Sequence, residues 1–275
     1  MADRHDPAPI QCIPRRALNR PSFVLAACLL ATSQARSDEW GGALGFANDN
    51  VYRGISLTAG RPAWLADLHY DVGTDWVIGL GGTADRPPRQ SATAQITIYI
   101  DRRWQLDEDW ATKVGAIHYD SPQSARAGQA CLSAVSADCA RTTDGRFSYD
   151  ELNAAIGYRG RWRASIALSP NASAPYAARP GQSGFGAWAE LTFHQPIADR
   201  LSADIGAGYA DLAQSGARNY RYGSVGLNYR VGDAYLYLTR IWTSPLFGAY
   251  PANPYAASPP CARWIASVIW SFQGS

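Results

Sequence analysis

From Trp40 onward, apolar and polar residues alternate along the chain in segments of roughly ten residues. In the segment 62–72, for example, Trp64, Ala66 and Leu68 share one face, while Leu65 and Asp67 fall on the other. Alternation with a period of two predicts β-strands, because successive side chains of a strand point to opposite faces. Twelve segments of this kind are present, at 40–53, 62–72, 76–85, 93–104, 110–119, 149–159, 161–169, 184–194, 201–210, 219–231, 234–242 and 263–272.

The connections between these segments alternate in length. Short turns are predicted at 73–75, 105–109, around Gly160, 195–200 and 231–233. The other connections are usually longer, at 54–61, 86–92, 120–148, 170–183, 211–218 and 243–262. Short periplasmic turns that alternate with longer outer loops are typical of outer-membrane barrels. The pattern predicts an all-β fold, a transmembrane antiparallel β-barrel of about twelve strands with both termini on the periplasmic side, and loop 120–148 as an extracellular insertion.

Aromatic residues at the strand ends separate this barrel from a soluble β-sandwich. A sandwich explains the alternation equally well, but membrane barrels also carry girdles of aromatic residues on their outer faces at both interfaces. At the expected periplasmic ends, the apolar faces carry Trp40, Tyr70, Trp76, Trp104, Trp110, Tyr158, Trp162, Phe193, Tyr229 and Phe272; at the other ends they carry Trp64, Phe185, Tyr209, Trp242 and Trp264. Between the girdles these faces are nearly free of charge, Arg240 near the outer rim being the exception.

Both ends of the chain suit export to the outer membrane. Arg15, Arg16 and Arg20 precede an apolar run at 23–31, and Ser33-Gln34-Ala35 offers small residues before a cut. A basic, then apolar, then small pattern predicts a signal peptide over 1–35 and a mature barrel over 36–275. Residues 25–28 also resemble a lipobox, which would lipidate Cys28, but the apolar run continues past that cysteine and favours the cut after Ala35. The last strand alternates up to Phe272, like the terminal signal recognised by the barrel-assembly machinery, although Gln273-Gly274-Ser275 follow it.

Composition and charge exclude two further classes of protein, helical membrane proteins and nucleic-acid-binding proteins. The mean hydropathy is −0.24, and no apolar stretch of helical transmembrane length follows residue 35. Removing residues 1–35 takes away four of 25 basic and two of 23 acidic residues, which leaves 21 of each. No basic stripe remains that would bind nucleic acid. Partners are therefore expected to be outer-membrane lipid, the assembly machinery and small polar solutes, with no cofactor.

Three cysteines remain after the signal peptide. Cys131 and Cys139 lie close together in a polar segment, so an oxidising compartment favours a disulfide between them. Cys261 has no evident partner in the sequence.

Two stretches resemble a known family. Residues 46–56 read FANDNVYRGIS and are followed by RPA at 61–63; Tyr149-Asp150-Glu151-Leu152 opens a later strand. Both are similar to the Gcw_chp or TorF family, whose opening strand ends in a Ser-Asp-Tyr-x-x-Arg-Gly-hydrophobic-Ser type of motif before a Pro-Ala pair. The resemblance implies an exported barrel assigned to the porins, without a proven function.

The polar faces supply the chemistry of the expected lumen. The residues predicted to line a pore are Arg53, Asp67, His69, Asp71, Asp101, Arg103, Lys113, Glu151, Asn153, Arg163, Glu190, His194, Asp204, Asn228 and Arg230. Five are basic and six acidic, with two histidines, so their sum implies no strong ion selectivity. The sequence therefore predicts a porin for passive diffusion of small polar solutes. The alternative within the same fold is a lumen that paired side chains fill.

The sequence supports other functions less strongly. A non-conducting barrel could act as an adhesin or structural protein through loops 120–148 and 243–262. A lipid hydrolase could use His118 near Asp120 and Ser121, or His69 beside Asp67 and Asp71, but no Gly-x-Ser-x-Gly motif or metal-type histidine pair is present. We therefore expect no enzyme activity, no catalytic residue and no metal site.

Overall fold

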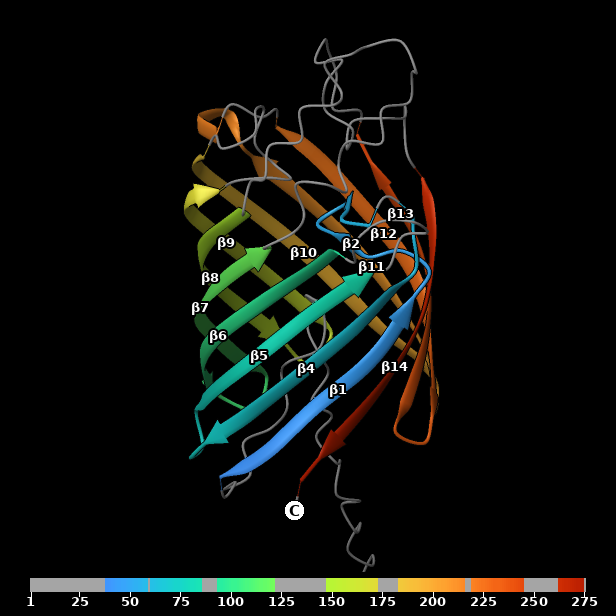
Figure 1. The fold of residues 1–275 in the computed structure, drawn as a ribbon. Coiled ribbons are helices and arrows are strands. Elements are labelled where there is room, and N and C mark those ends of the chain that lie inside the picture. The colour runs from blue at the N-terminus through green and yellow to red at the C-terminus, as the bar shows by residue number, and fades with distance from the viewer. Residues whose placement is uncertain are drawn as a thin grey trace, which may run out of the picture.

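Twelve antiparallel strands close into a barrel in a computed structural model, which describes residues 38–58, 60–85, 93–121, 147–172, 183–215, 219–244 and 262–274 (Figure 1). The barrel strands are β1 (Glu39–Ala47), β4 (Ala63–Val72), β5 (Trp76–Asp85), β6 (Thr93–Gln105), β7 (Trp110–Ser121), β8 (Phe147–Tyr158), β9 (Trp162–Ala172), β10 (Gly184–Ala198), β11 (Leu201–Asp211), β12 (Tyr220–Val231), β13 (Ala234–Thr243) and β14 (Arg263–Gln273). The predicted fold class is confirmed.

Closure comes from the first and last barrel strands. Each strand pairs with its sequence neighbours, and β1 pairs both with β4 and with β14. Gly41 faces Gln273 and Ala47 faces Ser267 in the β1–β14 register. A closed sheet has no unpaired edge, which is why such a barrel can stand in lipid, where unpaired backbone groups are costly. Such closed barrels are typical of bacterial outer-membrane proteins.

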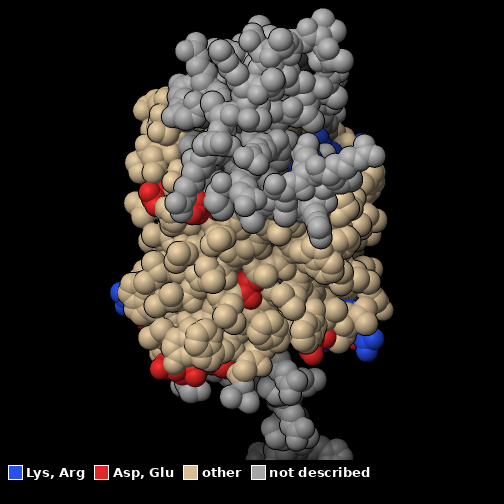
Figure 2. All heavy atoms as spheres, in the orientation of Figure 1, with Lys and Arg blue, Asp and Glu red and all other residues tan. Residues whose placement is uncertain are grey.

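The outer surface of the barrel is apolar. Alternate residues of each strand, such as Leu68, Ile98, Leu152, Ile205 and Leu238, are large, hydrophobic and exposed. One side of the barrel shows few charged groups between its two ends (Figure 2). A soluble sandwich would bury these faces in its core, so the closed barrel with its apolar exterior excludes that alternative.

Aromatic side chains ring both ends of this apolar surface. We call the ends the short-turn end, where β4 meets β5, and the long-connection end, where β7 meets β8. At the short-turn end the rings of neighbouring strands pack together, with centroids 4.8 Å apart for Trp40–Tyr70 and 4.5 Å for Trp162–Phe193. Tyrosine and tryptophan suit a membrane interface because their rings are amphipathic.

Arginines on the outward faces are also paired with rings. The guanidinium of Arg102 lies 4.8 Å from the ring of Trp104, and that of Arg240 lies 5.3 Å from the ring of Trp264. Arg240 therefore lies on the outward face near the long-connection end, as its place in the alternation predicts. A charge at the rim is tolerated at about 0–1 kcal/mol, and the ring adds a cation–π contact.

The predicted strand 40–53 is wrong in its last part, because β1 ends at Ala47. Val51–Tyr52 forms a separate short strand, β2, which pairs with β3 (Ile55–Ser56) instead of with the barrel. The reason lies in Asn48, whose side chain donates to the carbonyl of Trp264 and accepts from the N–H of Ala266. These bonds occupy the groups of β14 that a longer β1 would have paired, and the chain leaves the wall.

Some expectations fall outside the described residues. These are the signal peptide 1–35 with Ala35 and Cys28, most of loop 120–148 with Cys131 and Cys139, and Cys261. These expectations stay predictions. Because β7 ends at Ser121 and β8 begins at Phe147, the connection between these two strands is 122–146 rather than 120–148. Apart from the short 3-10 turn Ala213–Ser215, the described elements are strands, and no described helix is long and apolar enough to cross a membrane.

A charge placed on the outward face should reveal whether lipid covers it. Leu152 lies midway along β8 and is 62% exposed. Leu152→Arg should lower the free energy of unfolding by about 2–4 kcal/mol in lipid vesicles, since a basic residue at the membrane midplane costs that much. Leu106→Arg, in the turn between β6 and β7 at 59% exposure, is the matched control and should change little. Equal effects in urea titrations of the two variants would contradict a lipid-facing β8.

Candidate channel lumen and its constriction

The inward faces of the strands surround a polar cavity. Its volume is about 210 Å³. Of the residues predicted to line a pore, eight border this cavity: Arg53, Asp67, Asp101, Lys113, Glu151, Asn153, Arg163 and Glu190. The other seven do not border it: His69, Asp71, Arg103, His194, Asp204, Asn228 and Arg230. They occupy inward positions of their strands, mostly nearer the short-turn end. The cavity therefore lies on the long-connection side of these groups.

A short hairpin, β2–β3, folds into the barrel at the long-connection end (Figure 1). Its two-residue turn is Arg53-Gly54, with φ angles of 49° and 79°. Positive φ at both central residues is the geometry of a tight hairpin turn, and glycine adopts it without steric cost. The hairpin carries Arg53 into the lumen from a turn, whereas the sequence placed this residue at the end of a barrel strand.

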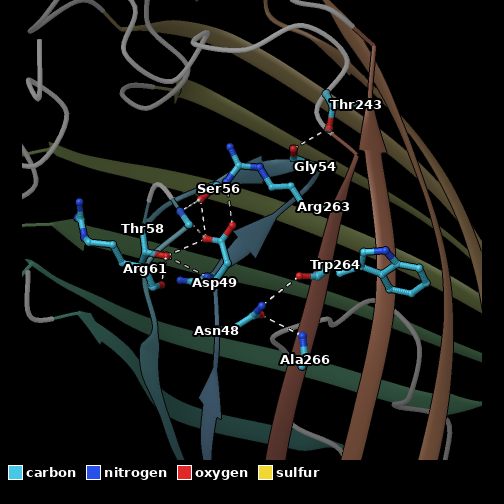
Figure 3. A network of polar contacts seen from close by, with 12 residues as sticks. Asn48, Asp49, Gly54, Ser56, Thr58, Arg61, Thr243, Arg263, Trp264 and Ala266 are labelled. Atoms are coloured by element: carbon cyan, nitrogen blue, oxygen red, sulfur yellow. Dashed lines mark hydrogen bonds and ion pairs between the residues drawn. The ribbon is translucent and has the colours of Figure 1, made fainter. Parts of the chain in front are cut away.

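Asp49 organises the base of the hairpin (Figure 3). One carboxylate oxygen accepts hydrogen bonds from the hydroxyls of Ser56, at 2.6 Å, and Thr58, at 2.8 Å, and from the N–H of Gly60, at 3.2 Å. The other oxygen pairs with Nη1 of Arg263 on β14, at 3.0 Å. Since Asp49 is only 4% exposed, this set of donors satisfies a buried carboxylate. The base of the hairpin is therefore held together by its own hydrogen bonds, and the ion pair with Arg263 attaches it to the last strand, β14.

The tip of the hairpin reaches the far wall of the barrel. Nη1 and Nη2 of Arg53 donate to the two carboxylate oxygens of Glu151 on β8, at 2.6 and 2.9 Å. Nε of Arg53 lies 3.9 Å from Glu190 on β10. In the strand order, β9 lies six strands from β1 in either direction, with β8 and β10 beside it. The hairpin therefore spans the lumen from the β1 side to the opposite wall.

Aromatic rings hold Arg53 in this position. Its guanidinium lies 4.7 Å from the ring of Tyr52 and 4.6 Å from the ring of Trp188. The hydroxyl of Tyr52 is hydrogen-bonded to that of Tyr119, at 2.9 Å, and Tyr119 stacks on Tyr149 with centroids 4.5 Å apart. A bidentate pair with a carboxylate combined with stacking on rings is a geometry that arginine provides and lysine does not.

The hairpin is also packed against apolar and polar groups of the neighbouring wall. Ile55 belongs to a buried cluster that includes Trp188, Leu212 and Tyr220. The hydroxyl of Thr243 on β13 donates to the carbonyl of Gly54, at 2.7 Å. Together with the Glu151 pair, these contacts make the hairpin a fixed constriction of the described lumen.

Polar clusters of the inward faces lie farther from the hairpin. Lys113 donates to Asp101, at 2.9 Å. Asp67 contacts Nδ1 of His69 and accepts from the hydroxyl of Tyr99, each at 2.9 Å. Asp204 contacts His194, at 2.5 Å, and Asn228. The inward charges are thus largely arranged in opposite-charge or hydrogen-bonded pairs, which is what a low-dielectric wall requires.

The structure also shows contributors that the sequence reasoning left out. Tyr99, Tyr119 and Tyr222 occupy inward positions, and the Tyr222 hydroxyl donates to Glu190, at 2.7 Å. The same alternation that selected the charged residues also places these tyrosines on the inner face. The alternation does not identify Asp49 and Arg263 in this way, because they act through a contact between residues that are 214 positions apart in the sequence.

The two groups of hydrolase candidates lie on opposite faces of the barrel wall. His118 faces outward near the long-connection end and is hydrogen-bonded to Asp150, at 2.7 Å. Asp150 in turn accepts from the side-chain amide of Asn171, at 3.0 Å. His69 contacts Asp67 inside the lumen. In the part of the chain that the structure describes, no three His, Cys, Asp or Glu side chains gather in a way that could hold a metal ion.

The fold and the polar inner face define the class as an outer-membrane-type β-barrel. Solved structures that are similar to this chain include an outer-membrane channel from Pseudomonas putida F1 (TM-score 0.46, 10% identity, 93% of this chain and 99% of the other) and the KdgM porin (0.45, 7%, 85% and 99%). A Pseudomonas aeruginosa FadL homologue is also similar (0.44, 10%, 86% and 89%). These likenesses concern the fold alone. No family model matches the sequence, and no curated protein matches it.

Proposed function

We propose that this protein is a porin of the outer membrane, which conducts small polar solutes passively past the β2–β3 hairpin. The observation that carries the proposal is the charged cavity enclosed by an apolar-faced barrel and bordered by Arg53, Lys113, Glu151 and Glu190. Its volume exceeds that needed for several water molecules, and polar groups surround it, so water can occupy it. Movement through it needs no catalytic step.

Export and family membership belong to the same proposal. The basic, apolar and small segments of residues 1–35 support export through a signal peptide. The resemblance to the Gcw_chp or TorF family gains support from the use that the fold makes of its motif. Asp49, Arg53, Gly54 and Ser56, which match the motif, all have contacts in the hairpin.

Planar-bilayer conductance tests the porin function directly. Protein purified from the outer membrane of an expression host, with heat-modifiable gel migration as evidence of a folded barrel, should give steady unit currents. Glu190→Ala removes a carboxylate from the cavity wall and should change the unit current and its ion preference. Arg240→Ala, on the outward face, is the control and should leave the current as it is.

A non-conducting barrel is the second candidate, and one observation favours it. The hairpin reaches Glu151 on the far wall, so it obstructs the described lumen. A barrel that folds and remains electrically silent would overturn the porin proposal. The role would then belong to the outer surface and its connections, as in an adhesin or a structural protein.

A further inference from the structure

An apolar groove lies on the outward face of the barrel, over the strands β8 to β12, which are side by side in the wall (Figure 1). Its volume is about 660 Å³. Four alanines line it, Ala154, Ala164, Ala189 and Ala207, at outward positions of four successive strands. An alanine side chain ends at Cβ, so these positions are recessed between larger outward neighbours such as Ile166, which is 53% exposed. The lipid-facing surface is therefore hollowed along this part of the wall.

The groove runs obliquely from the long-connection end into the apolar band. The strand register places Arg221, Tyr209, Ala189, Ile166 and Ala154 in one row across the five strands from β12 back to β8. Arg221 is the second residue of β12, at the long-connection end, whereas Ala154 lies past the middle of β8. Four spacings between strands make the row about 19 Å long. One leaflet contributes half of a hydrocarbon core of about 30 Å, so an acyl chain that descends from the interface fits along this row.

Two hydrogen-bond donors are neighbours at the long-connection end of the groove. They are the guanidinium of Arg221 and the hydroxyl of Tyr209, which occupy directly opposed positions of β12 and β11. The Tyr209 hydroxyl accepts from the side-chain amide of Asn219, at 3.0 Å, so its own proton is available to another acceptor. Within the described ranges the guanidinium of Arg221 has no ion pair. Asp211, on the same face of β11, accepts instead from the N–H of Ala213.

The chemistry of the groove complements a lipid that carries a phosphate group. The alanines and their apolar neighbours offer a surface for a hydrocarbon chain, and Arg221 with Tyr209 offers donors at the place where the chain would end. Guanidinium groups bind phosphate oxygens in a bidentate geometry, and tyrosines suit the depth of the headgroups. Because the groove is on the face that the barrel turns to the membrane, lipid is the molecule that meets it.

We propose that this groove is a binding site for a phosphate-bearing membrane lipid. One acyl chain lies over Ala189, Ala164 and Ala154, and Arg221 and Tyr209 bind the phosphate. The site is on the opposite side of the wall from the lumen, so it requires no conduction and is separate from the porin function proposed above.

Three probes separate the phosphate from the acyl chain. Native mass spectrometry of the folded barrel in a mild detergent measures the dissociation constants of phosphatidylglycerol, of diacylglycerol with the same acyl chains, and of glycerol 3-phosphate. Phosphatidylglycerol should bind most tightly. Arg221→Gln should weaken its binding by about tenfold and leave diacylglycerol unchanged, since a hydrogen bond to a charged group is lost. Arg240→Gln, which removes an outward arginine outside the groove, is the matched control and should change neither constant.

Filling the groove tests the position of the acyl chain. Ala189→Leu combined with Ala207→Leu should lose most of the binding of both phosphatidylglycerol and diacylglycerol, because larger side chains occupy the place of the chain. Ala66→Leu combined with Ala84→Leu makes the same change at exposed outward positions of β4 and β5, away from the groove. This control should bind both lipids as the unaltered protein does. Heat-modifiable migration establishes that each variant has folded.

Several results would overturn the lipid site. Diacylglycerol that binds as tightly as phosphatidylglycerol, or an Arg221→Gln variant with unaltered affinities, would remove the role of the phosphate. Glycerol 3-phosphate that binds as tightly as the lipid would remove the role of the groove. A protein dimer that the groove-filling variant dissociates would assign the groove to a second copy of the chain. An electrically silent barrel that prefers phosphatidylglycerol through Arg221 would support the lipid site and overturn only the porin function.

Discussion

Replacing Arg53 with alanine should lower the free energy of unfolding by about 3–5 kcal/mol, because Glu151 then remains in the wall as a buried charge without its partner. The Glu151 side chain is 1% exposed and now forms two hydrogen bonds with Arg53. The variant also loses the contacts of the guanidinium with Tyr52 and Trp188. Urea unfolding of the purified protein in lipid vesicles measures the loss. In a bilayer the same variant should show a larger unit conductance, because the tip of the β2–β3 hairpin no longer reaches the far wall.

A double variant separates the charge from the packing. Arg53→Ala with Glu151→Gln removes the unpaired charge, so a substantial part of the lost stability should return while the larger conductance remains. Arg240→Ala removes an arginine that stacks on a ring on the outward face, and should affect neither quantity strongly. If Arg53→Ala were as stable as the unaltered protein, the hairpin could not be docked as described.

Gly54→Val should displace the hairpin from the lumen. A Cβ at this position would lie 2.6 Å from Cβ of Tyr222 and 2.7 Å from Oγ1 of Thr243, in a backbone conformation with φ of +79°. The strained backbone alone costs about 1–3 kcal/mol, and the contact with the wall adds to it. Trypsin should then cleave after Arg53, which the docked hairpin protects, and mass spectrometry of the fragments detects that cut.

A second glycine provides the control for Gly54→Val. Gly73 has a φ of +59° in the turn between β4 and β5, and nothing lies within 4 Å of its hypothetical Cβ. Gly73→Val therefore introduces a comparable backbone strain without a clash or any contact with the hairpin. It should reduce stability modestly and leave Arg53 resistant to trypsin. Cleavage after Arg53 in both variants, or in neither, would contradict the docking of the hairpin through Gly54.

Much of the barrel could be predicted from the sequence because lipid imposes a strict rule on it. A residue such as Leu68 or Ile98 can face lipid only if its neighbours face inward, so the period of two continues through the strand. The aromatic ends, such as Trp40 and Trp264, then mark where each strand leaves the membrane. The twelve strands and their order followed from these local rules.

The hairpin could not be predicted in the same way, because its contacts are distant in sequence. Alternation continues through Val51 and Arg53, so the pattern alone extends the first strand beyond Ala47. The break depends on Asn48 meeting β14, which no local pattern reveals. The turn-forming residues Asn48-Asp49-Asn50 are the signal that could have ended the strand earlier.

The sequence identified inward-pointing residues, of which eight border the cavity, but not their arrangement. Alternation selects which side chains point inward, and a sum over them gives a nearly neutral lumen. The register of the strands then brings Arg103 opposite Lys113 and leaves Glu151 for Arg53. A charge count therefore cannot show which of the inward groups are paired with each other.

The contacts at the base of the hairpin couple the obstruction of the lumen to the closure of the barrel. Asn48 bonds to Trp264 and Ala266, and Asp49 pairs with Arg263, so each of these contacts joins the start of the barrel to its final strand. None can form while β1 and β14 are still apart in an open, partly inserted sheet. A half-assembled barrel therefore lacks these contacts at the base of the hairpin, and the docking of the hairpin is completed only when the last strand closes the wall.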